Sequence, residues 1–204
     1  MDVRDTGNFW RLAGPAVGMK GVMRLILLGT PGVGKGTQAL ELSECLHILH
    51  ISTGELLRVE MENKTPIGMQ IDKYMNAGEL VPDTIIIDML EKRLQEPDSR
   101  KGFVLDGFPR NLNQADYLKS SLERLQTPLD RVINIEVPID TVLNRLLQRN
   151  RADDTPETIK YRLEIYKQET IPLIDYYQRA GILEQINGDA SPEEVTNRIL
   201  ACIA

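Results

Sequence analysis

The chain has 204 residues, of which 42% are hydrophobic and 26% charged, and its formal net charge is −6. This length and composition suit one soluble globular domain with a full core. The negative charge excludes bulk electrostatic attraction to nucleic acid or anionic membranes, and no apolar run approaches the length of about 18 residues that a membrane span needs. We therefore expect no nucleic-acid or membrane partner, and any anion must be bound by local arginine clusters.

The N-terminal segment and the cysteines bear on where the protein works. Residues 1–22 contain no apolar core of a secretory signal, and Asp2 and Asp5 argue against a transit peptide. We expect a leader that is disordered or loosely docked. Cys45 and Cys202 have no CxxC spacing, which is typical of a reducing compartment, so we expect a cytoplasmic protein. We also expect a monomer.

Residues 23–45 contain the pattern around which the chain is organised. Residues 25–28 are apolar without helical or alternating period and predict a buried strand, whereas residues 38–45 have helical character. The turn between them is Gly29-x4-Gly34-Lys35. Glycines let backbone N–H groups surround a phosphate, and the following helix N-terminus and the lysine add positive charge. We therefore predict a phosphate-binding loop.

This loop departs from the generic motif at one position. The motif has Ser or Thr directly after the lysine as a magnesium ligand, but here Gly36 follows Lys35 and the hydroxyl comes at Thr37. The change disfavours GTPases and motor ATPases. It predicts that Mg²⁺ is held by phosphates, water and carboxylates, which suits an ion that keeps several waters.

Residues 46–51 predict a second strand, and residues 52–81 then predict two short helices. The first helix has the signature of a capping box, with Ser52 as its cap. Thr53 is not needed for the cap and is free to bind a ligand, and Arg58 follows in the second turn. The segment 52–81 has the size of a small insert that covers a substrate.

Residues 102–106 predict a third strand that ends in Asp106, the usual place for a carboxylate that orders magnesium beside a phosphate loop. A turn with proline follows and holds Arg110 at its end. Residues 131–137 and 181–186 predict the fourth and fifth strands.

Strands alternate with helices throughout, so we predict an α/β fold with a five-stranded parallel sheet and helices on both faces. Ligands bind at the carboxyl ends of such strands. The residues at or just after these ends are Gly32, Thr53, Asp106 and Gly107.

Four arginines lie within 18 residues in the second half of the chain: Arg145, Arg149, Arg151 and Arg162. Such a charged run is usually a solvated face, and the acids that follow could pair with it. Beside a phosphate loop we favour the other interpretation, because phosphoryl transfer requires cations on the transferred group.

Five motifs give residues 23–204 a resemblance to the nucleoside monophosphate kinases, and specifically to the adenylate kinase family. They are Gly-x-x-Gly-x-Gly-Lys-Gly-Thr at 29–37, Ser-Thr-Gly-Glu-Leu-Leu-Arg at 52–58, Gly-Glu-Leu-Val at 78–81, Asp-Gly-Phe-Pro-Arg at 106–110 with Gln114, and Arg-x-Asp-Asp at 151–154 with Arg162. The resemblance implies a P-loop NTPase-type fold and the reversible reaction ATP + AMP to 2 ADP, with Mg²⁺, which maintains the balance of adenine nucleotides.

The resemblance also implies roles for the matching residues. ATP would be bound by Gly32, Val33, Gly34, Lys35, Gly36, Thr37, Arg145, Arg149 and the backbone near Ala190. AMP would be bound by Thr53, Arg58, Glu79, Leu80, Val81, Gly107, Phe108, Pro109, Arg110, Gln114, Arg151 and Arg162, with Gln114 at the adenine edge. The catalytic residues would be Lys35, Asp106, Arg110, Arg149, Arg151 and Arg162. Asp106 would order Mg²⁺ through water.

The chain departs from the family pattern where only Asn150 separates Arg149 from Arg151 in place of a longer lid. We therefore expect a lid reduced to residues 149–154 and no structural zinc. The expected layout is completed by an AMP-binding insert at 52–81 and a core of residues 23–51 and 82–204.

Two alternatives stay open at this point. Pyrimidine kinases of the family tend to carry Ala and Asn where this chain has Thr53 and Gln114, so AMP is favoured over the acceptors of a UMP/CMP kinase. The other alternative is a catalytically silent nucleotide-binding protein, against which the intact Lys35, Asp106 and Arg110 argue.

Overall fold

The structure is a computed structural model that describes residues 22–148 and 155–204. The predicted leader at 1–22 lies outside the described residues except for Val22, and the predicted lid at 149–154 lies outside them entirely. Within the described ranges, no helix is both long and apolar enough to cross a membrane.

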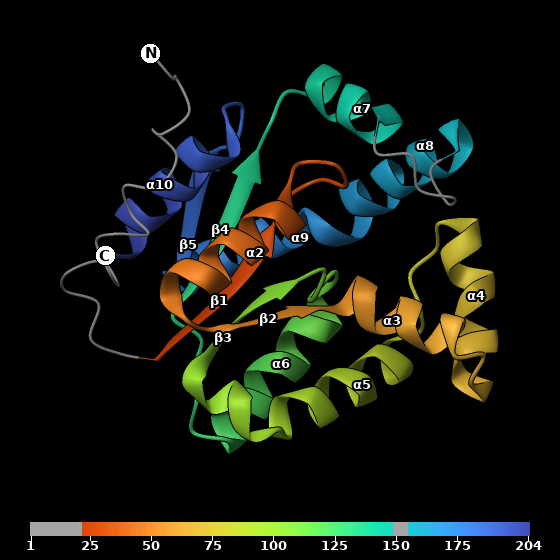
Figure 1. Cartoon of the computed structure of the whole chain (residues 1–204), viewed down its shortest axis with the longest axis horizontal. Helices are drawn as coiled ribbons and strands as arrows, with labels where there is room; N and C mark the ends of the chain where they lie inside the picture. The colour runs from red at the N-terminus through yellow and green to blue at the C-terminus, as the bar shows by residue number, and fades with distance from the viewer. Residues whose placement is uncertain (1–21, 149–154) are drawn as a thin grey trace, which may run out of the picture.

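A parallel sheet of five strands forms the centre of the molecule (Figure 1). Its order is β2-β3-β1-β4-β5, and every neighbouring pair is parallel. The bounds are β1 (Met23–Leu28), β2 (Leu49–Ser52), β3 (Gly102–Asp106), β4 (Arg131–Glu136) and β5 (Leu183–Asn187). The predicted fold class is confirmed, because helices pack on both faces of this sheet.

The two faces explain why the first strand is apolar without interruption. Ile26 and Leu28 point into one core cluster, whereas Leu25 and Leu27 point into the other. Successive residues of a strand alternate between faces, so a strand covered on both sides must be apolar at every position. All four side chains are at most 2% exposed.

Eight further α-helices follow α2 (Lys35–Leu46) in the described part of the chain. They are α3 (Thr53–Glu62), α4 (Pro66–Ala77), α5 (Asp83–Gln95), α6 (Leu112–Arg124), α7 (Ile139–Gln148), α8 (Pro156–Ile165), α9 (Pro172–Arg179) and α10 (Pro192–Ile203). A π-helical turn, Tyr166–Thr170, joins α8 to α9 just before Pro172. Figure 1 shows α3 and α4 on the side of the sheet away from α10, with α4 facing α8.

The predicted start of the second strand was wrong. Residues 46–48 were expected to be extended, but α2 continues through Leu46 and His47 ends it in a left-handed conformation with φ 54°. Leu46 packs against the core cluster under α2, so an apolar residue that fits a strand pattern serves the end of a helix here. β4 ends one residue before, and β5 begins two residues after, the predicted bounds.

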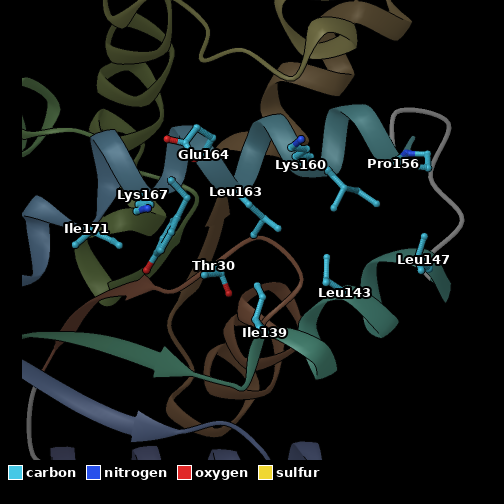
Figure 2. Close-up of a pocket in the computed structure, with 12 residues that line it drawn as sticks. Thr30, Ile139, Leu143, Leu147, Pro156, Lys160, Leu163, Glu164, Lys167 and Ile171 are labelled. Atoms are coloured by element: carbon cyan, nitrogen blue, oxygen red, sulfur yellow. The ribbon is translucent and has the colours of Figure 1, made fainter.

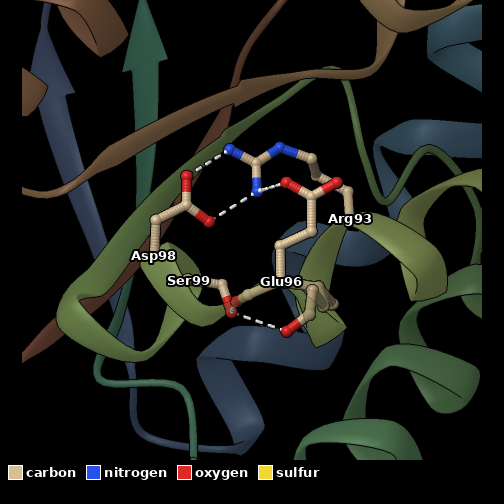
Figure 3. Close-up of polar contacts among 5 residues, drawn as sticks. Arg93, Glu96, Asp98 and Ser99 are labelled. Atoms are coloured by element: carbon tan, nitrogen blue, oxygen red, sulfur yellow. Dashed lines mark hydrogen bonds and ion pairs between the residues drawn. The ribbon is translucent and has the colours of Figure 1, made fainter.

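An ion pair and a capping serine connect α5 to the start of β3 (Figure 3). Arg93 binds both carboxylate oxygens of Asp98 at 2.8 Å and contacts Glu96 at 2.8 Å. Its hydrogen bonds hold the pKa of the Asp98 carboxyl below its usual range. Ser99 Oγ donates to the carbonyls of Leu94 and Glu96 at the end of α5. The buried serine fixes this connection, since the exposed ion pair is weakened by solvent.

Candidate active site

The turn between β1 and α2 has the backbone of a phosphate-binding loop. Gly32 has φ 86°, and a Cβ atom on it would lie 2.5 Å from Leu146 Cγ, so only glycine fits there. Gly34, with φ 106°, sits at the N-cap of α2 and has no side chain to occupy the first N–H groups of the helix. Those groups stay available to an anion. Lys35 Nζ lies across the loop and donates to the carbonyls of Gly29 and Thr30 at 2.7 and 3.0 Å.

The last residue of β3 faces this loop. A Cβ atom on Gly36 would lie 3.4 Å from Asp106 Oδ2, so the carboxylate stands beside the first turn of α2. Thr53 Oγ1, from the end of β2, donates to the Asp106 carbonyl at 3.3 Å. Thr53 is 1% exposed, and this bond uses the proton of its hydroxyl, while the oxygen can still accept a hydrogen bond. A binding role for Thr53 stays a prediction. The ends of β1, β2 and β3 thus meet at one place.

Arg110 lies next to this meeting point. Its Nε donates to the Gly107 carbonyl at 2.8 Å, and the preceding Phe108 and Pro109 are buried under it. The surrounding protein desolvates the guanidinium and lowers the pKa of Arg110. Because the side chain keeps contact with solvent, we expect it to stay charged at neutral pH.

Two more cations approach Arg110 from other elements. Their charges also lower the pKa of Arg110, while that of Asp106 raises it. Arg58, on α3, folds back so that its Nη1 lies 3.5 Å from the Cβ position of Gly54. Arg162, on α8, donates to the carbonyl of Met75 at 3.3 Å. The structure therefore brings the charges of Arg58, Arg162 and Asp106 close to that of Arg110.

Gly78 brings the end of α4 into contact with α8. It caps α4 with φ 76°, and its Cβ position lies 2.9 Å from Thr158 Cγ2. The segment 79–81 follows this contact. In it, Glu79 is exposed, Leu80 is half-buried and Val81 is buried. The predicted acceptor segment therefore begins beside Arg162.

The loop between β5 and α10 is tied to the phosphate loop. Arg145 donates to the carbonyls of Val33 and Gly188 at 3.1 and 3.5 Å, and Ala190 follows two residues later. Gln38, in the second turn after the glycines, donates to the Pro192 carbonyl at 2.9 Å. The sequence does not mark Gln38 as a site residue, because its burial at 3% exposed comes from the packing of α2.

Sequence reasoning also missed Asp83 and Thr170. Asp83 Oδ1 accepts a hydrogen bond from Gln114 Nε2 at 2.6 Å, and Thr170 Oγ1 donates to the Arg110 carbonyl at 2.8 Å. Asp83 is the first residue of α5, and Thr170, in the π-helical turn, is 60 residues from Arg110 in the sequence. The predicted Arg149 and Arg151 lie outside the described residues.

A groove of about 630 Å³ runs between α7 and α8 (Figure 2). Its centre is apolar, with Ile139 and Leu143 of α7 facing Leu163 of α8, and it touches the phosphate loop at Thr30. Of the predicted site residues within 22–148 and 155–204, none lines it. The charges and strand ends described above, and not this groove, therefore mark the candidate site. In the described ranges, no three His, Cys, Asp or Glu side chains are grouped as a metal centre.

A glycine-rich phosphate loop, a strand-end carboxylate of a parallel sheet and three neighbouring arginines define a P-loop phosphotransferase. The family model described as adenylate kinase matches residues 27–182. Adenylate kinase 1 of Nostoc sp. is 50% identical over 180 residues, which cover 88% of this chain and 98% of the relative. The adenylate kinase of Xylella fastidiosa is 48% identical over 185 residues, 89% and 99% of the two chains. The chain belongs to the adenylate kinase family.

This membership decides the class of reaction. The chain is a nucleoside monophosphate kinase with adenylate kinase activity, which transfers a phosphoryl group reversibly between ATP and AMP. Neither a UMP/CMP kinase nor a catalytically silent protein is favoured.

Proposed function

We propose that the site divides into a donor half on the phosphate loop and an acceptor half on the segment 52–81 and the turn after β3. One observation carries the proposal: the charges of Arg58, Arg162 and Asp106 all lie near Arg110, and the Asp106 carboxylate faces the first turn of α2. A group transferred between two phosphates would pass between these cations and the loop. Its charge is neutralised there without a covalent intermediate.

The donor half comprises Gly32, Val33, Gly34, Lys35, Gly36 and Thr37, with Arg145 and Ala190 toward the adenine. Lys35 Nζ spans the loop through the Gly29 and Thr30 carbonyls, so it is held over the cradle where an outer phosphate would replace those contacts. Arg149 completes this half as predicted from the family pattern.

The acceptor half would hold AMP by its phosphate and by its base. Arg58, Arg110 and Arg162 suit the phosphate because a planar guanidinium offers paired N–H groups. Gln114 suits the adenine edge, and the backbone of Glu79, Leu80 and Val81 with Thr53, Gly107, Phe108 and Pro109 forms the walls. Arg151, which lies in the short lid, would close on the phosphates.

Asp106 fits a role with Mg²⁺. Mg²⁺ prefers carboxylate oxygen, water and phosphate, and Asp106 Oδ2 stands against Gly36, at the position where the generic loop has a hydroxyl ligand. The bound ion would neutralise charge on the ATP phosphates. The Asp106 carboxylate would hold the ion beside the phosphate loop through water.

The layout that supports this proposal has residues 52–81 as the AMP-binding insert and 149–154 as the short lid, with residues 23–51 and 82–204 as the core. We propose that the two segments close over the nucleotides and exclude water, which would otherwise hydrolyse ATP. We further propose a cytoplasmic monomer without structural zinc.

A panel of acceptors tests the proposal. With ATP and Mg²⁺, we expect turnover with AMP and little with UMP, CMP or GMP, measured as ADP formed in a coupled assay. Turnover with UMP but not AMP would contradict the acceptor assignment, and turnover with none would leave only nucleotide binding.

The Lys35→Ala variant tests the donor half. We expect kcat to fall by roughly 100-fold or more, since a positioned charge at the transferred group is lost. The melting temperature should change little, because Lys35 is only half-buried and lies outside the apolar core. Lys64→Ala, an exposed lysine at the α3–α4 turn, is the matched control, and near-normal turnover in Lys35→Ala would remove Lys35 from the mechanism.

A further inference from the structure

Gln114, the residue assigned to the adenine of AMP, is held by hydrogen bonds at both polar atoms of its carboxamide. Gln114 is 2% exposed and lies in the first turn of α6. Its Oε1 accepts a hydrogen bond from the backbone N–H of Arg110 at 2.7 Å, and its Nε2 donates to Asp83 Oδ1 at 2.6 Å. A backbone N–H can only donate and a carboxylate only accepts. The two contacts together therefore permit one of the two orientations of the carboxamide.

Asp83 is itself held in place. It is the first residue of α5, where the helix dipole favours a negative charge. Asn111 Nδ2 donates to both of its carboxylate oxygens, at 3.2 and 3.4 Å. Asn111 Oδ1 in turn caps α6 by accepting from the N–H of Gln114 at 2.9 Å. The ends of α5 and α6 are thus joined, with the carboxylate directed at the glutamine.

We propose that Asp83 is a positioning residue for base selection, which fixes the Gln114 carboxamide so that its donor and acceptor face the acceptor base in one order. The inference rests on the proposed function, in which Gln114 meets the adenine edge. A carboxamide has two N–H groups and two lone pairs. One of each is used by Asp83 and Arg110, so one N–H and one lone pair remain for the base.

The remaining N–H and lone pair of Gln114 match the donor and acceptor of adenine in one orientation only. Adenine offers an amino donor next to a ring-nitrogen acceptor. Hypoxanthine has the same shape but the reverse order, a carbonyl acceptor next to a ring N–H donor. A glutamine free to turn over would serve both bases, whereas the fixed one leaves polar groups unpaired against hypoxanthine. The discrimination between AMP and IMP therefore reports how firmly the carboxamide is held.

Two substitutions of Asp83 test the proposal, with kcat and KM measured for AMP and IMP at saturating ATP. Asp83→Ala removes the carboxylate, which can only accept a hydrogen bond from Gln114. We expect the AMP-to-IMP ratio of kcat/KM to fall roughly fivefold, about the effect of one hydrogen bond. The fall should come mainly from a higher KM for AMP. The KM for ATP should stay the same, because the donor half is untouched.

Asp83→Asn separates positioning from packing. Asparagine keeps the size of the side chain but can present either an oxygen or an amino group, so residue 83 no longer opposes a turned-over Gln114 and only the Arg110 N–H still does. We expect the AMP-to-IMP ratio to fall in this variant with the melting temperature preserved. If Asp83→Ala does not fold, this variant decides the question. Asp88→Ala, on an exposed position of the same helix, is the control and should change neither value.

Gln114→Ala distinguishes the possible failures. An unchanged ratio in both Asp83 variants, with a reduced ratio in Gln114→Ala, would overturn the positioning role and leave the proposed function standing. An unchanged ratio in Gln114→Ala would show that Gln114 does not read the base, which overturns both. Absence of AMP turnover in the unaltered chain would contradict the proposed function itself.

Discussion

At the scale of single residues, the site depends on where side chains are missing as much as on where they are present. Gly36 occupies the position at which the generic loop carries a hydroxyl, and Asp106 Oδ2 lies 3.4 Å from where its Cβ would be. The carboxylate therefore has direct access to the phosphate loop. A side chain on residue 36 would compete for it.

The Gly36→Ser variant tests this relation. Its hydroxyl can donate to the Asp106 carboxylate, and we expect the Mg²⁺ concentration for half-maximal activity to rise about tenfold, the effect of one hydrogen bond to a charged group. Activity would be titrated with Mg²⁺ at fixed ATP. Gly36→Ala adds the Cβ without the hydroxyl and should shift the value less. A lower requirement for Mg²⁺ would instead mean that the serine becomes a metal ligand.

At the scale of secondary-structure elements, α3 and α4 form a pair that must pack very closely. A Cβ atom on Gly68 would lie 2.0 Å from the Glu60 carbonyl oxygen, which is backbone and cannot turn aside. The Thr65 side chain between the two helices caps α4 through the Gly68 N–H at 2.9 Å. Ile71, fully buried, then anchors α4 to the core. The position of Arg58 and of the Gly78 contact depends on this pair.

We therefore predict that Gly68→Ala separates α3 from α4. The clash should lower the free energy of unfolding by about 1–3 kcal/mol, which outweighs the usual gain of alanine in a helix. The KM for AMP should rise while the KM for ATP stays constant, as measured by steady-state kinetics and urea unfolding. Gln70→Ala, at an exposed position of α4, is the control, and equal rises in both KM values would contradict the assignment of this pair to the acceptor half.

At the scale of the whole molecule, three tyrosines make the free energy of unfolding depend on pH in the alkaline range. Burial, followed by the charge of Glu136, raises the pKa of Tyr166 to about 12. Burial and a hydrogen bond to Asp116 raise that of Tyr176 to about 12, and burial raises the pKa of Tyr177, which packs edge-on against Tyr176. The folded state therefore holds these protons more tightly than the unfolded state does.

The sign of the resulting pH dependence follows from linkage. These groups contribute full stability below the unfolded tyrosine pKa of about 10, and that contribution is lost as the pH rises toward about 12. We expect the free energy of unfolding, measured in urea, to fall over this range. Tyr177→Phe should make the fall shallower, whereas Tyr161→Phe, on the exposed surface of α8, should not. An identical slope in Tyr177→Phe would mean that Tyr177 does not contribute.

The sequence by itself determined the fold class, the family and the phosphate loop. Local patterns sufficed because a fully apolar strand such as 25–28 needs cover on both faces, and because a phosphate cradle requires glycines at set spacings. It also placed Asp106, Arg110 and Gln114 near strand ends or in motifs. Element boundaries were less well determined, as Leu46 shows, since an apolar side chain can serve a strand or a helix end.

Only the tertiary structure decided which groups act on one another. Asp83 and Gln114 are 31 residues apart, and Thr170 and Arg110 are 60 apart, so no local period connects them. Their contacts depend on how α5, α6 and the π-helical turn pack on the sheet. For the same reason the engagement of Thr53 with Asp106 could not be foreseen. Long-range contacts are set by packing, whereas a motif reports only what one stretch of backbone requires.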